Sequence, residues 1–388
     1  MLQIGVASKM RGHEYGVVVP EGRHNPRTKE KNYIWLGNRF AEDSHIILGR
    51  LTGLGGLFSW FSTRRLIDEL KKMKPDVIHL HNLHNCYINL PLLFGYLKSS
   101  GVKTVWTLHD CWAFTGKCPH YLMANCDRWK TGCHHCSQLS SYPVSWIDST
   151  SAMWKLKKHW FNGVDNMTIV TPSRWMSEQL KESFLKEYPV RIINNGIDLS
   201  VFTPVHGDFR ERYKISRDEF VVLGVAFGWG VRKGLDVFVE LSKRLGKGFR
   251  IVLVGTDDKI DRQLPENIIS IHRTESQSEL AGIYSAADVF VNPSREDNYP
   301  TVNMEALACG TPVITFDTGG SAEIINESCG AAVDCGNIDS LEQEILSTQR
   351  LNQYTRQACT EHAKSFDKNR IFCEYVNLYE ELYGKPSN

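Results

Sequence analysis

The feature that most constrains the fold is an alternation of short β-rich runs with stretches of helical periodicity. The expected strands are Tyr15–Val19, Asp76–Leu80, Lys103–Thr107, Thr168–Thr171, Arg191–Ile193, Val221–Ala226, Arg250–Val254, Asp288–Asn292 and Val313–Phe316. The expected helices are Thr63–Met73, Arg174–Glu187, Gly234–Leu245, Ser276–Ala286 and Leu341–Leu346. Short strands that alternate with helices are typical of parallel sheets covered by helical layers. The sequence therefore predicts an α/β protein.

The chain is long enough for two or three domains, at 388 residues. The natural boundary is Asn194–Pro204, where Asn-Gly and a later Pro mark turns. We expect one domain at 1–194 and a second at 195–366, with the amphipathic segment 367–388 packing back on the first. Because Ile4–Met10 reads as the end of a helix, we expect the first domain to lack the strand and Gly loop that normally open such a domain.

Composition and charge narrow the class of protein. A hydrophobic fraction of 42%, a charged fraction of 23% and a net charge of +1 fit a soluble globular protein and give no reason to expect a nucleic-acid partner. No run of about 18 apolar residues is present, and no signal peptide is visible. The 11 Cys, mostly scattered among apolar neighbours, favour reduced thiols, so we expect a cytoplasmic location.

The segment Arg295–Val313 reads as a turn, a short helix and a stop. Asn298, Tyr299 and Pro300 supply turn chemistry, and Thr301 is a plausible N-cap for a helix that a Gly-Thr-Pro run closes. A helix start leaves backbone N–H groups free, and these attract phosphate together with the positive end of the helix dipole. The segment therefore predicts a phosphate-binding site.

Three carboxylates accompany this turn. Glu296 and Asp297 precede it, and Glu305 is expected in the first helical turn. Carboxylates at this place suit the hydroxyl groups of a ribose and of a sugar. The alternative for Glu305 is a structural role, as a first-turn glutamate that complements the helix dipole.

Two glycine-bearing loops repeat this logic. The first places Gly228, Gly230, Arg232 and Lys233 between an expected strand and a helix. Glycines let the backbone approach a ligand closely, and the two cations suit a diphosphate, although a plain turn with two solvated charges is the alternative. The second loop, Thr318–Glu323, carries two further glycines before a helix expected to open at its Ser, and its alternative is a simple tight turn.

Taken together and in their order along the chain, the motifs make the chain similar to the retaining GT-B glycosyltransferases of family GT4. Within that family it most resembles enzymes of capsule, exopolysaccharide and colanic-acid-type synthesis. The resemblance implies two Rossmann-like, doubly wound domains that face each other across a cleft. It rests on Asp76–His81, Trp106–Gly116, Val170–Arg174, Ile193–Asp198, Phe202, Arg232–Gly234, Tyr284–Ser294, Glu296–Val313 and Asp317–Glu323.

The resemblance also implies roles for individual residues. His109, Lys233, Glu296 and Asp297 occupy positions that act in catalysis. The donor-binding positions are Gly228, Gly230, Arg232, Lys233, Asn298, Tyr299, Pro300, Thr301, Glu305, Gly319 and Gly320.

The chain departs from the family pattern in two places. The family usually has seven residues between its two glutamates, whereas Glu296 and Glu305 have eight between them and Asp297 stands at the seven-residue spacing. Either Glu296 or Asp297 is therefore expected to face the sugar. Many family members also carry an Arg six positions before the phosphate-binding Lys, where this chain has Phe227, and Arg232 is the alternative source of that charge.

The implied reaction moves a sugar, with retention, from a nucleoside-diphosphate sugar to a hydroxyl of a glycan or a lipid-linked acceptor in surface polysaccharide synthesis. No Asp-x-Asp motif appears in the relevant loops, so we expect the chemistry to need no divalent metal or other cofactor. A non-catalytic nucleotide-sugar-binding protein is the alternative, because the first domain reads as incomplete. A sugar-nucleotide epimerase of the GT-B fold is a third hypothesis.

Four cysteines raise the question of a structural zinc ion. Cys118, Cys126, Cys133 and Cys136 include a Cys-x-x-Cys pair, but the spacing of the first two is irregular. The alternative is a loop with several buried or free thiols. Zinc, if bound, would hold a long loop in place without taking part in catalysis.

Two other groups of residues each have a structural and a functional interpretation. The basic, aromatic segment Trp154–Trp160 reads either as a packed helix or as a membrane-surface helix, which would place the protein peripherally at the inner face of the membrane. His79, His81 and His84 resemble a metal cluster, but strand alternation puts His79 and His81 on one face, and we favour hydrogen-bonded histidines.

Overall fold

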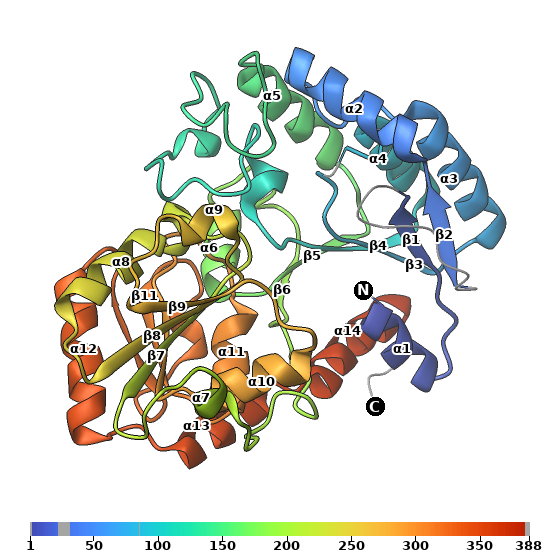
Figure 1. Ribbon diagram of the computed structural model, residues 1–388. Coiled ribbons are helices and arrows are strands. Elements are labelled where there is room, and N and C mark those ends of the chain that lie inside the picture. The colour runs from blue at the N-terminus through green and yellow to red at the C-terminus, as the bar shows by residue number, and fades with distance from the viewer. Residues whose placement is uncertain (1, 22–31, 85, 385–388) are drawn as a thin grey trace. The chain divides into compact units, whose positions relative to one another are not determined.

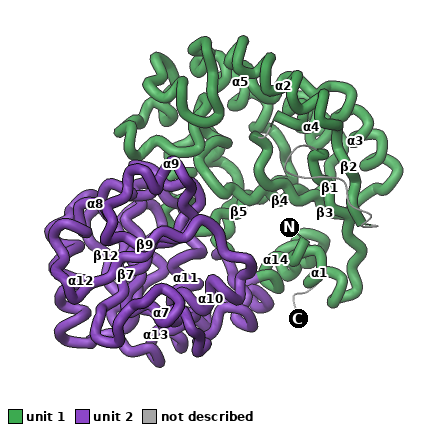
Figure 2. Tube along the Cα trace, viewed as in Figure 1, with its two compact units in different colours: residues 1–193, 372–388 green, residues 194–371 purple. Residues whose placement is uncertain are grey.

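The computed structural model describes residues 2–21, 32–84 and 86–384. The chain divides into two compact units (Figure 2), unit 1 with residues 1–193 and 372–388 and unit 2 with residues 194–371. Residues 385–388, at the end of the segment expected to return to the first domain, lie outside the described residues. Each unit is an α/β structure built on parallel strands.

Unit 1 is built on a four-stranded parallel sheet in the order β3-β4-β5-β6, and a separate parallel pair joins β1 to β2 (Figure 1). The strands are β1 (Val17–Pro20), β2 (Tyr33–Leu36), β3 (Val77–Leu80), β4 (Lys103–Thr107), β5 (Met167–Thr171) and β6 (Val190–Ile192). Residues of β4 and β5 are almost fully buried, as expected for strands covered on both faces.

The helices of unit 1 are α1 (Leu2–Met10), α2 (Arg39–Thr52), α3 (Trp60–Met73), α4 (Leu90–Ser100), α5 (Thr150–Phe161), α6 (Arg174–Lys181), the later part of α14 (Lys368–Tyr383), and the short 3₁₀ helices η1 (Cys111–Phe114) and η2 (Arg128–Lys130). The helices from α3 to α6, with η1 and η2, contribute to one core. The core is rich in aromatic rings, among them Phe94, Trp106 and Phe161, which lie within 5.5 Å of one another by ring centroids.

The last helix is tied to the rest of unit 1 by polar contacts. Glu380 of α14 accepts from Arg11 at 3.0 Å and pairs with His13 at 2.9 Å, just after α1. The hydroxyl of Tyr379 lies 2.6 Å from Nδ1 of His79, on β3. The C-terminal segment therefore completes unit 1 at the strands that carry the histidine motif.

The helix α5 is a packed helix, and the membrane-surface interpretation of Trp154–Trp160 is wrong. Trp154, Lys157, Trp160 and Phe161 are buried, and Trp154 Nε1 donates to the carbonyl of Trp129 at 2.8 Å. The aromatic side chains of this segment are thus in the core and are not available to lipid. No helix within the described ranges is both long and apolar enough to span a membrane.

Unit 2 contains a six-stranded parallel sheet in the order β12-β11-β10-β7-β8-β9. Its strands are β7 (Phe220–Val225), β8 (Phe249–Val254), β9 (Ile268–Ile271), β10 (Val289–Asn292), β11 (Val313–Asp317) and β12 (Gly330–Asp334). Counted from β7, this is the strand order 3-2-1-4-5-6 of the Rossmann fold. The order reverses between β7 and β10, so the switch point of the sheet lies there.

Helices cover both faces of this sheet (Figure 1). Alternate residues of the strands point to opposite sides, so Leu223 packs with Met304 of α11 on one face, while Val222 packs with Phe238 of α8 on the other. The helices are α7 (Phe209–Arg212), α8 (Leu235–Arg244), α9 (Asp258–Asp261), α10 (Gln277–Ala286), α11 (Thr301–Ala308), α12 (Ile338–Leu351) and α13 (Arg356–Ala363), with the 3₁₀ helices η3 (Val231–Lys233), η4 (Ala322–Ile324) and η5 (Lys364–Phe366).

Candidate functional site

Three loops of unit 2 meet at the carboxyl ends of neighbouring strands. They follow β7, β10 and β11, which lie side by side in the sheet. In open α/β sheets, ligands bind outside the carboxyl ends of strands at the switch point. Because that point lies between β7 and β10, the fold brings together the loops that the sequence predicts to bind the donor.

The loop after β7 leads through η3 into α8. Gly234 has φ of +75°, and a Cβ there would lie 2.5 Å from the carbonyl oxygen of Pro293, so only glycine fits between this loop and the exit of β10. A Cβ at Gly228 or Gly230 would meet nothing within 4 Å, so the backbone there has open space on that side. Phe227 is 99% exposed and carries no charge into the site.

The two cations of this loop engage the loop after β10. Lys233 Nζ lies 2.6 Å from Oδ2 of Asp297, and each side chain is 19% exposed. Arg232 donates to the carbonyl oxygen of Glu296 at 3.3 Å. The Lys233–Asp297 contact joins the loops that follow β7 and β10, at the switch point of the sheet.

The two acidic candidates before the turn have different surroundings. The residue Glu296 is only 4% exposed, whereas the Asp297 side chain keeps partial access to solvent beside Lys233. Arg295 pairs with Asp236 of α8 at 2.7 Å, which fixes the loop against that helix. Asp297 is therefore the more accessible carboxylate, and it stands at the family spacing.

The helix α11 begins one residue earlier than expected. Pro300 occupies the N-cap in an extended conformation, and Thr301 is the first helical residue. Glu305 is consequently in the second turn, so the expected first-turn position is wrong by one residue. The dipole effect is concentrated in the first turn, which weakens the structural explanation for Glu305.

Glu305 is held by a tyrosine that sequence reasoning missed. Tyr284 of α10, fully buried, lies with its hydroxyl 3.1 Å from Oε2 of Glu305. Burial raises the pKa of the Glu305 carboxyl, while hydrogen bonds from Tyr284 and Thr301 oppose that shift. No sequence signal links Tyr284 with Glu305, because the contact depends on how α10 packs beside α11.

The turn between β10 and α11 is fixed by backbone contacts. Asn195 Nδ2 donates to the carbonyl oxygen of Tyr299 at 3.0 Å, and both Asn298 and Tyr299 are buried. The expected turn residues therefore shape the start of α11. Asn195, which follows the domain boundary, is a second residue that motif reading did not single out.

The glycine pair after β11 differs from its expected role. Gly320 N–H donates to the carbonyl oxygen of Asn298 at 2.8 Å, so this amide binds the neighbouring loop and is not bare. Gly319 has φ of +56°, and a Cβ there would lie 1.7 Å from the carbonyl oxygen of Asp297. The helix expected at Ser321 is only the 3₁₀ turn η4. This pair therefore positions Asp297 by close packing, because the two loops approach too closely for a side chain.

In unit 1, His109 belongs to a chain of histidines at the ends of β3 and β4. Its Nε2 lies 3.0 Å from Nδ1 of His81, and the ring of His81 lies 4.0 Å from that of His79 by centroids. His79 in turn contacts Thr107 at 2.7 Å. Burial lowers the pKa of His109 and lowers that of His79 to about 3, so these rings are neutral. As expected, His79 and His81 share a face and are hydrogen-bonded.

The residue after His109 forms a second polar group. Asp110 pairs with His84 at 3.0 Å, and the other ring nitrogen of His84 lies 3.0 Å from the hydroxyl of Tyr142. Although burial pushes the Asp110 pKa upward, hydrogen bonds from His84 and the Trp112 amide hold it below its ordinary value. The structure thus places a carboxylate–imidazole pair beside the expected histidine.

The four cysteines lie in one loop system of unit 1. The Cys118 thiol hydrogen-bonds to Cys136 and so lowers the Cys136 pKa to about 6. In the described part of the chain, the one group of three or more potential metal ligands within 4.8 Å of one another is the exposed set Asp258, Asp261 and His272. The four thiols are not gathered to that extent, and the zinc site stays a prediction.

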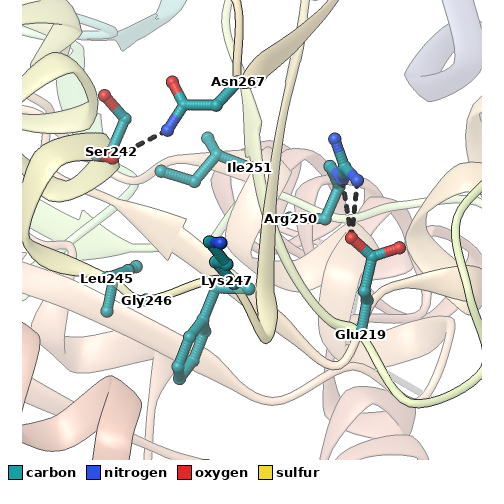
Figure 3. A pocket seen from close by; sticks show the side chains of 9 residues that line it. Glu219, Ser242, Leu245, Gly246, Lys247, Arg250, Ile251 and Asn267 are labelled. Atoms are coloured by element: carbon teal, nitrogen blue, oxygen red, sulfur yellow. Dashed lines mark hydrogen bonds and ion pairs between the residues drawn. The ribbon is translucent and has the colours of Figure 1, made fainter.

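A pocket of about 370 Å³ lies at the other edge of the unit 2 sheet, beside the amino ends of β7, β8 and β9 (Figure 3). Its wall includes an ion pair between Arg250 and Glu219 at 2.6 Å and a bond from Asn267 to the Ser242 carbonyl at 2.8 Å. Its lining contains none of the predicted site residues. Because donors bind at carboxyl ends, we exclude this pocket as the donor site.

Comparison with known proteins agrees with this architecture. Residues 218–349 match the profile of Glycosyl transferases group 1. WcaC of Escherichia coli (strain K12), named as a colanic acid biosynthesis glycosyl transferase, is 26% identical over 325 residues, or 79% of this chain and 77% of that protein. An N,N'-diacetylbacillosaminyl-diphospho-undecaprenol alpha-1,3-N-acetylgalactosaminyltransferase of Campylobacter jejuni is 24% identical over 220 residues, or 53% of this chain and 58% of that protein.

A solved structure shares the fold. HepE of Anabaena in complex with UDP-glucose superposes with a TM-score of 0.62 at 14% identity, over 97% of this chain and 94% of that one. Residues 2–201, more than half of the chain, match the profile of Glycosyltransferase Family 4. The chain therefore belongs to glycosyltransferase family 4 and is a glycosyltransferase with the GT-B fold.

Proposed function

We propose that the protein transfers a sugar, with retention, from a nucleoside-diphosphate sugar to a glycan or lipid-linked acceptor in surface polysaccharide synthesis. The observation that carries this proposal is the Lys233–Asp297 contact of 2.6 Å at the switch point of the unit 2 sheet. A cation and a carboxylate in this place fit two parts of the donor, its diphosphate and its sugar. HepE, a protein of the same fold, is named in complex with UDP-glucose.

Each group at this site has a proposed partner on the donor. Lys233 and the amides of the first turn of α11 bind the diphosphate, because a helix start presents N–H groups that lack partners within the helix. Glu305, held by Tyr284, binds the ribose hydroxyls. Asp297 orients the hydroxyls of the sugar, and its greater exposure favours it over Glu296. Donor binding exchanges the Asp297 contact of Lys233 for a phosphate contact.

Stabilisation of the leaving diphosphate is the main catalytic effect that we propose. Negative charge grows on the phosphate as the glycosidic bond breaks, and preorganised cations and amides stabilise that charge more strongly in the transition state. We assign no side chain as a nucleophile. In the front-face route of the family, the departing phosphate takes the proton of the acceptor hydroxyl, so no separate protein base is required.

Unit 1 is proposed to serve the acceptor. Its neutral histidine chain ends at His109, which can donate or accept a hydrogen bond without adding charge. The relative from Campylobacter jejuni is named for a diphospho-undecaprenol substrate, which supports a lipid-linked acceptor. We propose that His109 contacts the reacting sugar or the leaving phosphate.

Activity of a Lys233→Ala variant tests the proposed function. Loss of one such contact typically lowers kcat by about 10²- to 10³-fold, and we expect no more than a small change in melting temperature. Lys243→Ala is the matched control, because Lys243 is an exposed lysine of α8 paired with Glu240. The donor that wild type uses is first identified among UDP-, GDP- and ADP-sugars. Equal activity of the two variants with that donor would contradict the proposal.

The stereochemical outcome needs its own measurement. The anomeric configuration of the product, read from NMR coupling constants, is expected to match that of the donor sugar. An inverted product would remove the proposed front-face route while leaving the donor site in place.

A peripheral membrane location is also part of this proposal, but on a different surface from α5. His45 is the one buried residue of α2, and two aromatic side chains are exposed at helix starts, Phe40 of α2 at 81% and Phe61 of α3 at 84%. Arg39, Arg50, Arg64 and Arg65 are exposed on the same two helices. Aromatic side chains with arginines suit the interface of an anionic bilayer.

Co-sedimentation with vesicles tests this α2–α3 face. Wild-type protein should bind vesicles that contain phosphatidylglycerol and lose binding in neutral vesicles. The double variant Phe40→Ser and Phe61→Ser should bind at least fivefold more weakly, while Leu351→Ser, an exposed residue of unit 2, should bind as wild type. Equal binding by all three proteins would exclude this face.

A further inference from the structure

The carboxylate of Glu305 has no cation beside it. Among the described residues, none of the Lys, Arg and His side chains lies at ion-pair distance from Glu305, and its contact with a side chain of another helix is the one with Tyr284. Burial is the largest influence on the Glu305 pKa, which it raises. A carboxylate in such a place is costly unless hydrogen bonds stabilise it. A hydroxyl group therefore serves Glu305 where a cation would usually be found.

The direction of the bond between Tyr284 and Glu305 is fixed by the chemistry of the two groups. The Tyr284 hydroxyl lies 3.1 Å from Oε2 of Glu305. Burial holds the pKa of the Tyr284 phenol well above its ordinary value, so the phenol keeps its proton. An ionised carboxylate can only accept. The phenol is therefore the donor, and it favours the ionised form of Glu305.

Tyr284 is itself held firmly in α10. Its side chain is fully buried, and its ring meets that of Phe290 on β10 edge-on, with ring centroids 5.5 Å apart. The backbone carbonyl of Tyr284 accepts from the hydroxyl of Thr311 at 2.6 Å, and the Thr311 amide donates to the carbonyl of Ala306 at 2.9 Å. Thr311 thus ties α10 to α11. The phenol hydroxyl consequently has a fixed place relative to the helix that carries Glu305.

The place of Glu305 on α11 suits the ribose of a bound nucleotide. Glu305 lies four residues after Thr301, on the same face of the helix and about 6 Å further along its axis. The first turn of α11 is the proposed diphosphate site, so a nucleotide held there has its ribose within reach of the next turn. A carboxylate accepts about four hydrogen bonds. The bond from Tyr284 uses one of these, which leaves enough capacity for both vicinal hydroxyls of a ribose.

A carboxylate that is held before the ligand arrives discriminates better than a mobile one. A Glu side chain loses rotamer entropy when it is ordered, and preorganisation removes that cost from the binding step. A site built to hydrogen-bond a hydroxyl also rejects an analogue that lacks it, because the site's own polar group is then left unpaired. Both effects depend on Glu305 being fixed in position.

We propose that Tyr284 is a positioning residue that makes the donor site select ribonucleotides over 2′-deoxyribonucleotides, acting through Glu305. The inference rests on the proposed function, in which Glu305 binds the ribose hydroxyls. Tyr284 is fully buried and does not touch the donor. It holds Oε2 of Glu305, and the carboxylate accepts from the 2′- and 3′-hydroxyls. Without the phenol hydroxyl the carboxylate is free to turn away, and the preference for a 2′-hydroxyl weakens.

Calorimetric titration with nucleoside diphosphates tests this role. The probes are whichever of UDP, GDP and ADP wild type binds most tightly and its 2′-deoxy counterpart, and the readout is the ratio of their Kd values. Wild type should bind the ribonucleotide about 10- to 150-fold more tightly, the usual range for a hydrogen bond to a charged group. Tyr284→Phe should lower this ratio at least fivefold by weakening ribonucleotide binding alone, with the Kd of the 2′-deoxynucleotide within twofold of wild type.

Two further variants complete the test. Tyr354→Phe is the matched control, because Tyr354 forms a similar bond to Glu344 at 2.7 Å elsewhere in unit 2, and it should keep the wild-type ratio. Glu305→Asp keeps the charge but shortens the side chain by one methylene, so it should lower the ratio at least fivefold. This variant decides the question if Tyr284→Phe does not fold, since a full ratio in Glu305→Asp would show that the position of the carboxylate is unimportant.

The outcomes separate this inference from the proposed function. A ratio that Glu305→Ala abolishes but Tyr284→Phe leaves unchanged would overturn the role of Tyr284 alone. Equal losses of affinity for both nucleotides in Tyr284→Phe would show a merely structural role and would also overturn it. A wild type without preference for the ribonucleotide, or a preference that Glu305→Ala keeps, would remove the ribose assignment of Glu305 as well. A protein that binds no nucleoside diphosphate would contradict the proposed function itself.

Discussion

Substitution of Gly319 by alanine should disable the donor site through a residue that has no functional group. Gly319 has φ of +56°, and an added Cβ would lie 1.7 Å from the carbonyl oxygen of Asp297. Ordinary Cβ contacts are not shorter than 3.0 Å, so the Asp297 backbone must move by about 1.3 Å. The 2.6 Å contact between Asp297 and Lys233 would not survive such a shift.

Two separate effects are expected from this change. The left-handed conformation of alanine costs about 1–2 kcal/mol, which corresponds to a decrease in melting temperature of about 2–8 °C for a domain of this size. The displacement of Asp297 adds a loss of activity of about 10²-fold, since an error of about 1 Å in a positioned group can have that effect.

Gly336→Ala separates these two effects. Gly336 also has a positive φ, +87°, but a Cβ there would meet nothing within 4 Å. This control should therefore lower the melting temperature by a similar backbone amount and keep full activity. The assay is kcat/KM for donor consumption together with a thermal melt. The reasoning is refuted if Gly319→Ala loses stability as Gly336→Ala does while its activity stays within twofold of wild type.

Three further predictions concern single side chains. Asp297→Asn should lower kcat at least tenfold more than Glu296→Gln in the same assay, and the reverse order would assign the sugar to Glu296. Burial raises the Glu305 pKa, so the stability that the protonated carboxyl contributes is present below its ordinary pKa and is lost as the pH rises through the raised pKa. The melting temperature of Glu305→Gln, which cannot ionise, should therefore increase relative to wild type from about pH 4 to pH 7.5. A difference in melting temperature that stays constant would contradict this. Tyr379→Phe should destabilise the protein by about 1 kcal/mol in urea unfolding, because it removes the 2.6 Å contact with His79, and no change would show that the contact is dispensable.

Strands with strong apolar patterns could be predicted from the sequence, and strands defined by pairing could not. All nine expected strands are present with small shifts of their ends. The structure adds β2, β9 and β12 to these. The strand Gly330–Asp334 is made largely of small residues, and its identity comes from its pairing along β11.

Helices were missed or misplaced for local reasons. The helix Leu90–Ser100 contains Pro91 and Gly95, which mask its periodicity, although a proline in the first turn is compatible with a helix. The helix expected at Arg174–Glu187 ends at Lys181, because Ser183 bonds back to the Leu180 carbonyl and the chain turns to bury Leu185.

The proximity of the candidate-site loops was predictable where the loop and its charged residue belong to one recognisable motif. Lys233 and Asp297 belong to loops that the strand order of a doubly wound sheet must bring together. Tyr284 and Asn195 were missed because their roles depend on packing between distant segments. The bond of the Gly320 amide to the neighbouring loop could not be predicted, because a bare amide and a bonded amide have the same sequence.

The central claim is that unit 2 binds the donor through its diphosphate, with Lys233 as the cation. Calorimetric titration of wild type and Lys233→Ala with matched nucleoside diphosphates and monophosphates measures this directly. Wild type should prefer the diphosphate that its donor contains, and Lys233→Ala should weaken diphosphate binding by about 10- to 150-fold, the equivalent of about 1.5–3 kcal/mol for a hydrogen bond to a charged group. Unchanged diphosphate affinity in Lys233→Ala, or no preference for a diphosphate in wild type, would contradict the account.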